Sequence, residues 1–179
     1  MTCRVGLRLA LGLAVLLALP LGAQRRRDPF NNEEINQLRD AMLDPDERLK
    51  LYVKFARDRM NKLEVMRGDA KTTDRARQTH DMLADFLAVY DELNDNVDMY
   101  VGRKDDIRKP LKLIIEADTE FQAKLRAVKD AANTDAAEAK QYEFVLSNAI
   151  DTVDASADDH RQTVTEVEAY VKRKKKTSK

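Results

Sequence analysis

Apolar residues recur every three or four positions through most of this chain, the pattern of helices that bury one face. The pattern is longest near the C-terminus, where the apolar positions between Tyr142 and Val171 advance by about 3.6 residues per step. This period favours a straight helix of a globular bundle over the 3.5-residue repeat of a coiled coil. The spacing predicts helices over 44–67, 73–101, 105–132 and 135–173, and a short additional helix over 32–43.

The residues at the ends of these segments are those that start and stop helices. Asp44 can cap the first long helix, and Pro45 suits its first position. Gly68 and Gly102 are the only glycines after residue 23, and each follows a periodic stretch. Short connections between long helices favour antiparallel neighbours. The sequence therefore predicts an all-α domain over 32–171, an up-down antiparallel four-helix bundle with a long C-terminal helix and a short N-terminal extra helix.

The last predicted helix is longer than its partners, so we expect its C-terminal part to overhang them. Alternating helix directions place the short segment 32–43 at the same end of the bundle. We therefore expect this segment to cover the overhang, with Ile35, Leu38 or Met42 near Val164, Val167 or Val171.

The N-terminus has the layout of a secretory signal peptide. Arg4 and Arg8 precede an apolar run over 9–19, and Ala23 offers a small residue for cleavage before Gln24. The run is shorter than the ~20 residues that a spanning helix needs. We predict a signal peptide over 1–23 and a secreted or periplasmic protein. The alternative is an uncleaved N-terminal membrane anchor.

Composition adds a strong asymmetry of charge. Residues 28–171 carry 21 basic and 32 acidic side chains, a net charge of −11, whereas both flanking segments are basic. We predict a basic, flexible segment over 24–31 and a basic tail over 172–179. In an up-down bundle these two segments come towards one end, which predicts a surface that binds anionic lipid or an acidic envelope polymer. Its residues are Arg25, Arg26, Arg27, Lys172, Arg173, Lys174, Lys175 and Lys176. No aromatic residues alternate with the lysines, which argues against nucleic acid.

No motif for catalysis, haem or phosphate binding is present, and the single cysteine, Cys3, lies in the predicted signal peptide. A metal site would need His80, His160 and Asp118 together. Matching the helices across their predicted loops puts His80 about 27 Å from His160 and Asp118 about 15 Å from it. We therefore predict no metal and no cofactor, and a hydrogen-bonded histidine in the core.

Two short patterns have simpler explanations than a binding site. Asp91, Asp95 and Asp98 share one helical face but lack the glycine and glutamate of a calcium loop, so a solvated face is favoured. Arg67-Gly68-Asp69 spells an adhesion tripeptide, but its glycine coincides with a predicted helix end.

Two classes of function follow. The favoured one is a non-enzymatic exported helical bundle, a scaffold or interaction module of the cell envelope that has a protein partner or forms a homo-oligomer. The other is a periplasmic ligand-binding bundle with an apolar pocket between its helices. The pocket would lie among aromatic residues whose spacing places most of them in the core: Tyr52, Phe55, Phe86, Tyr90, Phe121, Tyr142 and Phe144.

Overall fold

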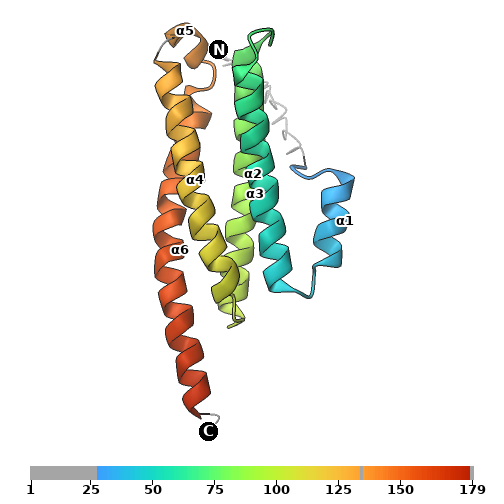
Figure 1. Ribbon diagram of the computed structural model, residues 1–179, viewed down its shortest axis with the longest axis vertical. Helices are drawn as coiled ribbons and strands as arrows, with labels where there is room; N and C mark the ends of the chain where they lie inside the picture. The colour runs from blue at the N-terminus through green and yellow to red at the C-terminus, as the bar shows by residue number, and fades with distance from the viewer. Residues whose placement is uncertain (1–27, 134, 178–179) are drawn as a thin grey trace, which may run out of the picture.

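The computed structural model describes residues 28–133 and 135–177, and these residues form helices and connecting turns with no strand. The predicted all-α fold is confirmed. The helices are α1 (Asn32–Asp40), α2 (Pro45–Gly68), α3 (Arg75–Gly102), α4 (Arg108–Ala132), α5 (Ala136–Ala139) and α6 (Glu143–Thr177). The four long helices lie side by side, and α1 lies outside them against α2 (Figure 1).

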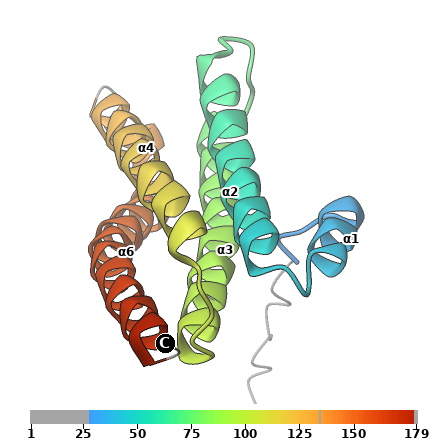
Figure 2. The same ribbon diagram turned by 60° about the horizontal axis from the view of Figure 1, so that its bottom comes forward.

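The long helices form two hairpins, α2 with α3 and α4 with α6, and the hairpins stack against each other (Figure 2). Within each hairpin the helices are antiparallel. Between the hairpins the contacts join helices of the same direction, α2 with α4 and α3 with α6. The hydrogen bonds show this, because Arg57 bonds Glu120 and Asn61 bonds Lys124, both 63 residues further along the chain.

The stacking differs from a bundle in which every neighbour is antiparallel. Since α2 contacts α3 and α4 while α6 contacts the same two helices, α3 and α4 lie diagonally opposite one another. Asn94 of α3 donates a hydrogen bond to Ser156 of α6, 62 residues later, so this second interface has nearly the same offset as the first. Two of the four interfaces are therefore parallel.

The segment after α4 also differs from the prediction of a single helix over 135–173. Asp135 caps the short helix α5 by accepting a hydrogen bond from the Glu138 N–H, and turns over 140–142 separate α5 from α6. Glu138 bonds Arg75 of α3 and Arg67 of α2, which holds α5 across the end of the first hairpin. These residues form a connection, so they do not contribute length to α6.

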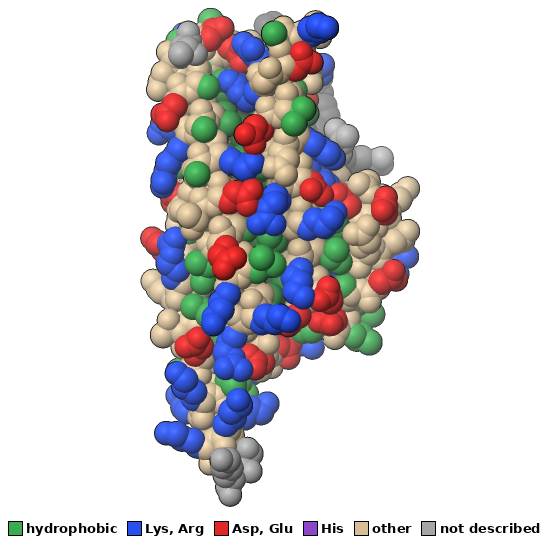
Figure 3. Space-filling model, in the orientation of Figure 1, with side chains coloured by type: hydrophobic (Ala, Val, Ile, Leu, Met, Phe, Trp, Pro, Cys, Tyr) green, Lys and Arg blue, Asp and Glu red, His purple; other side chains and the backbone are tan. Residues whose placement is uncertain are grey.

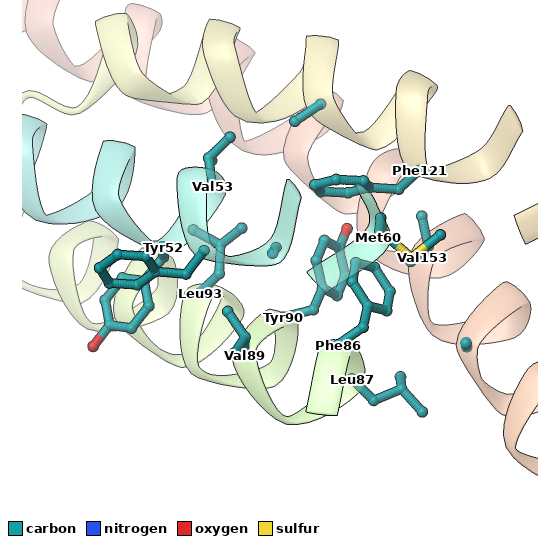
Figure 4. Packing of buried hydrophobic residues seen from close by; sticks show 14 of the residues in the cluster. Tyr52, Val53, Met60, Phe86, Leu87, Val89, Tyr90, Leu93, Phe121 and Val153 are labelled. Carbon is teal, nitrogen blue, oxygen red and sulfur yellow. The ribbon is translucent and has the colours of Figure 1, made fainter. Parts of the chain in front are cut away.

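The core follows the predicted apolar faces closely. Phe86 and Tyr90 of α3 pack edge-on against Phe121 of α4, with ring centroids 5.2 and 6.0 Å apart (Figure 4). These aromatic contacts fill the space between the diagonal helices. Most of the seven aromatic residues named above are buried, as predicted, and the exception is Phe144, which is 87% exposed at the start of α6.

The predicted position of the N-terminal helix was also wrong. α1 packs on α2, on the side of the molecule away from α6, and Met42 is exposed (Figures 1 and 2). The cause is a buried ion pair, in which the Arg59 guanidinium of α2 donates two hydrogen bonds to the Glu34 carboxylate of α1. Glu34 also completes the capping box of α1 with Asn31. The valines Val167 and Val171 are nevertheless buried in the same core cluster as Ile107, which precedes α4.

Candidate functional site

The last turns of α6 form the most basic described surface. α6 continues past the predicted end at residue 173 to Thr177, so Lys172–Lys176 belong to a helix and not to a separate tail. Their side chains are exposed. The end of α6 projects beyond the other helices, and Lys and Arg side chains gather on it (Figures 1 and 3). We call residues Lys172–Lys176 the basic end of α6.

The charge of the basic end stabilises the helix that carries it. Cations in the last turn stabilise a helix because the unpaired carbonyl groups there carry partial negative charge. Asp106, before α4, lies close enough to interact with the positive charge of Lys175. The Arg108 guanidinium holds the pKa of Asp106 below its usual range, and the charge of Lys175 adds to the effect.

The other predicted basic residues, Arg25–Arg27, lie outside the described residues. The described chain begins at Asp28, and the carbonyl oxygen of Pro29 accepts a hydrogen bond from Arg59. Arg59 lies 14 residues into α2, about 20 Å along the helix axis from the end where α2 starts. The chain thus enters the described domain at mid-height of α2 and not at the end of the bundle where α6 finishes.

The predicted hydrogen-bonded core histidine is His160, but the buried polar network to which it belongs was not predicted. The Tyr90 hydroxyl donates a hydrogen bond of 2.7 Å to Asp118 Oδ1, and His160 Nδ1 lies 2.8 Å from Asp118 Oδ2. The three residues come from α3, α4 and α6, and each is 1% exposed or less. Burial, together with the adjacent Asp118 carboxylate, raises the pKa of Tyr90.

The predicted separation of Asp118 from His160 was therefore wrong. That estimate extended α6 back to residue 135, whereas α6 begins at Glu143. The shift moves each residue of α6 along the α4 surface and brings His160 level with Asp118. The sequence did contain a sign of this pairing. Asp118 and His160 both lie on otherwise apolar helical faces, as paired core residues do. Because the network is buried, it fixes how three helices pair and offers no surface to a solute.

The remaining candidate motifs do not assemble into metal or adhesion sites. Among the described residues, no group of three or more His, Cys, Asp and Glu side chains could hold a metal ion. His80 is exposed beside Asp81, near the end of the bundle that lies opposite the basic end of α6. Arg67 of the adhesion tripeptide bonds Thr79 and Glu138 and stacks on the Tyr142 ring, so its guanidinium is engaged inside the molecule.

The surface has several open grooves, and one of them lies between α1 and α3. It holds about 620 Å³ and is lined by apolar side chains, two arginines and four acids, Asp28, Asp91, Glu92 and Asp95. Of the aromatic residues named for the alternative ligand pocket, Phe86, Tyr90 and Phe121 contact each other in the core. Tyr52 lines the groove between α1 and α3.

Comparison with known proteins found no matching protein family, no matching curated protein and no matching solved structure. Within the described part of the chain, no helix combines the length and the apolar character that crossing a bilayer requires.

Proposed function

We propose that this protein is an exported, non-enzymatic interaction module that attaches to anionic lipid surfaces through the basic end of α6. The observation that carries the proposal is the exposed cluster Lys172–Lys176 on a helix that extends beyond the rest of the molecule (Figure 3). Export rests on the signal-peptide pattern of residues 1–23.

The distribution of charge supports attachment by this end in particular. Residues 28–171 carry a net charge of −11, so an anionic surface repels most of the molecule and attracts the end of α6. Basic residues near an anionic bilayer each contribute up to about 1 kcal/mol. Five adjacent cations are therefore enough for measurable, reversible binding, with the long axis of the bundle directed away from the surface.

The test is sedimentation with vesicles that contain phosphatidylglycerol or phosphatidylserine. The parent protein should bind at low salt, and binding should weaken steeply between about 0.01 and 0.15 M salt, as the Debye length falls from about 30 to 8 Å. Replacing Lys172, Arg173, Lys174, Lys175 and Lys176 with glutamine should abolish binding.

A matched control removes five exposed lysines elsewhere, Lys54, Lys62, Lys71, Lys129 and Lys140, and produces the same change in net charge. This control variant should bind vesicles as well as the parent does. Equal loss in both variants would show that only net charge matters. Parent binding that survives high salt, or no binding at low salt, would refute the proposal.

A further inference from the structure

The described chain begins on the outer face of α3, between two hollows. Asp28 lines the groove between α1 and α3 together with Asp91, Glu92 and Asp95. Asp28 also lines a second hollow, of about 310 Å³, together with Met82 and Asp85 of α3. Asp28, the first described residue, therefore lies next to α3 in both hollows.

This part of α3 carries charge of one sign. Residues 78–102 contain six acidic side chains and no lysine or arginine. Most of the acids are exposed: Asp81, Asp91, Glu92, Asp95 and Asp98. The arginines that line the groove come from the opposite wall and are already bonded, Arg48 to Leu38 O, Tyr52 and Asn96, and Arg39 to Asn36.

Arg25–Arg27 are joined directly to Asp28, so their reach is short. Three extended residues span about 10 Å at most. This distance equals about seven residues along a helix. Asp85 and Asp91 border the two hollows at Asp28, and the charged side chains of α3 within this reach are all acidic. Arg59 and Lys62 of α2 also line the second hollow, and Arg59 is already paired with Glu34.

We infer that Arg25–Arg27 bind the acidic outer face of α3 and form a basic arm across the groove between α1 and α3. Arginine suits this role because its guanidinium presents several donors in a fixed plane that matches a carboxylate. The tether favours the contact further, since a short connection gives a high effective concentration. The two basic segments of the chain then have different roles: the arm binds α3, and the exposed basic end of α6 is the segment proposed to bind anionic lipid.

Trypsin cleavage after Arg25, Arg26 and Arg27 tests this contact, because a bound arm fits the protease poorly. The protein is purified from cells that make the full chain, and its N-terminus is sequenced to establish that the arginines are present. Cleavage in the arm is measured at low salt relative to cleavage after Lys71, which lies in the exposed turn between α2 and α3.

The informative variant combines Asp91→Asn, Glu92→Gln and Asp95→Asn. All three side chains are exposed, so α3 keeps its fold, and an unchanged far-ultraviolet circular dichroism spectrum verifies this. Three exposed ion pairs together support an increase in relative arm cleavage of about tenfold. Raising the salt concentration should bring the parent to the same rate as the variant.

The matched control combines Asp151→Asn, Asp159→Asn and Glu166→Gln on the exposed surface of α6, with the same change in net charge. The control should be cleaved like the parent. The inference is overturned if the parent and the α3 variant are cleaved equally fast, or if the control accelerates as much as the α3 variant.

Discussion

At the scale of single residues, the Tyr90–Asp118–His160 network is the feature that departs most from an apolar core. A buried carboxylate without partners would be very unfavourable, but Asp118 lies within hydrogen-bond distance of groups on two other helices. The network therefore makes one arrangement of α3, α4 and α6 much more favourable than arrangements shifted by a turn. Apolar contacts alone distinguish less sharply between the native arrangement and a shifted one, because apolar contacts do not depend on the direction of a bond.

Removing single members of the network should give graded losses of stability. Tyr90→Phe leaves the ring packing intact and removes one donor, so we expect the free energy of unfolding to fall by about 1–2 kcal/mol. Asp118→Ala removes the acceptor that Tyr90 and His160 share and also creates a cavity, so we expect a loss of about 3–5 kcal/mol. Urea denaturation measures both.

Tyr170→Phe is the control, because Tyr170 is only half-buried and its ring contact with Lys104 survives the change. Its effect should stay within about 0.5 kcal/mol. A loss for Tyr90→Phe no larger than that of Tyr170→Phe would show that the Tyr90 hydrogen bond contributes nothing to stability.

At the scale of elements, α1 depends on one ion pair more than on apolar contact. Arg59 donates to both Glu34 oxygens and to the Pro29 carbonyl, which joins the start of the described chain and α1 to α2. Phe30 adds ring contacts with Tyr52 and Phe55. A buried pair is sensitive to loss of one partner, since the other charge stays behind unpaired.

Arg59→Ala should therefore release α1 without unfolding the two hairpins. Loss of one partner of a buried ion pair costs about 3–5 kcal/mol. Amide hydrogen exchange over α1 should then accelerate by at least about 100-fold, while amides in the middle of α3 should keep their protection.

A double variant separates the charge from the contact. Glu34→Gln with Arg59→Met leaves no buried charge, and glutamine can still accept the Asn31 N–H bond that caps α1. Exchange over α1 should return close to the parent rate. If this double variant exchanges as fast as Arg59→Ala, the unpaired Glu34 charge is not the cause of the release.

The elements also show how far sequence patterns reach. The long helices and their buried faces follow from apolar spacing, because spacing records which side of a helix meets the core. The position of α1 does not follow, since it depends on Glu34 and Arg59, residues 25 positions apart that both resemble surface residues. The register of α6 depends on the break after α4, where Asp135 caps α5 and turns over 140–142 precede α6. Apolar spacing over 135–142 continues through that break. For the candidate site, the sequence identifies the cations at Lys172–Lys176. It does not predict that these residues are helical, because α6 continues to Thr177, past the predicted end at residue 173.

At the scale of the whole molecule, stacked hairpins place charged contacts on the seams between elements. Glu138 joins α5 to α2 and α3, and Glu34 joins α1 to α2. The Arg75 guanidinium, with help from Arg67, holds the pKa of Glu138 below its usual range, and the Arg59 guanidinium does the same for Glu34. At Tyr52, Tyr90 and Tyr100 burial disfavours the charged phenolate. It therefore raises the pKa of each phenol.

These pKa shifts predict a plateau of stability with two sloping sides. A carboxyl whose pKa is lowered by folding adds stability above its unfolded pKa, about 4.5, and that stability disappears as the pH falls. A phenol whose pKa is raised by folding adds stability below its unfolded pKa, about 10, and that stability disappears as the pH rises. The free energy of unfolding should therefore vary little between about pH 5 and 9.5 and decline on both sides. Urea denaturation from pH 3 to 11 measures the profile.

Two variants assign the sides of the plateau to their groups. Glu34→Gln with Glu138→Gln lowers stability on the plateau and should make the acid side shallower, because two carboxyls whose pKa changes on folding are gone. Tyr90→Phe should make the alkaline side shallower and leave the acid side unchanged. Each variant is the control for the other, since each removes ionisable groups that titrate on one side only. The decisive quantity is how steeply the free energy of unfolding falls with pH on the acid side. If the double glutamine variant and the parent have the same slope there, other carboxylates of the acidic body control acid unfolding, and the ion pairs of Glu34 and Glu138 do not.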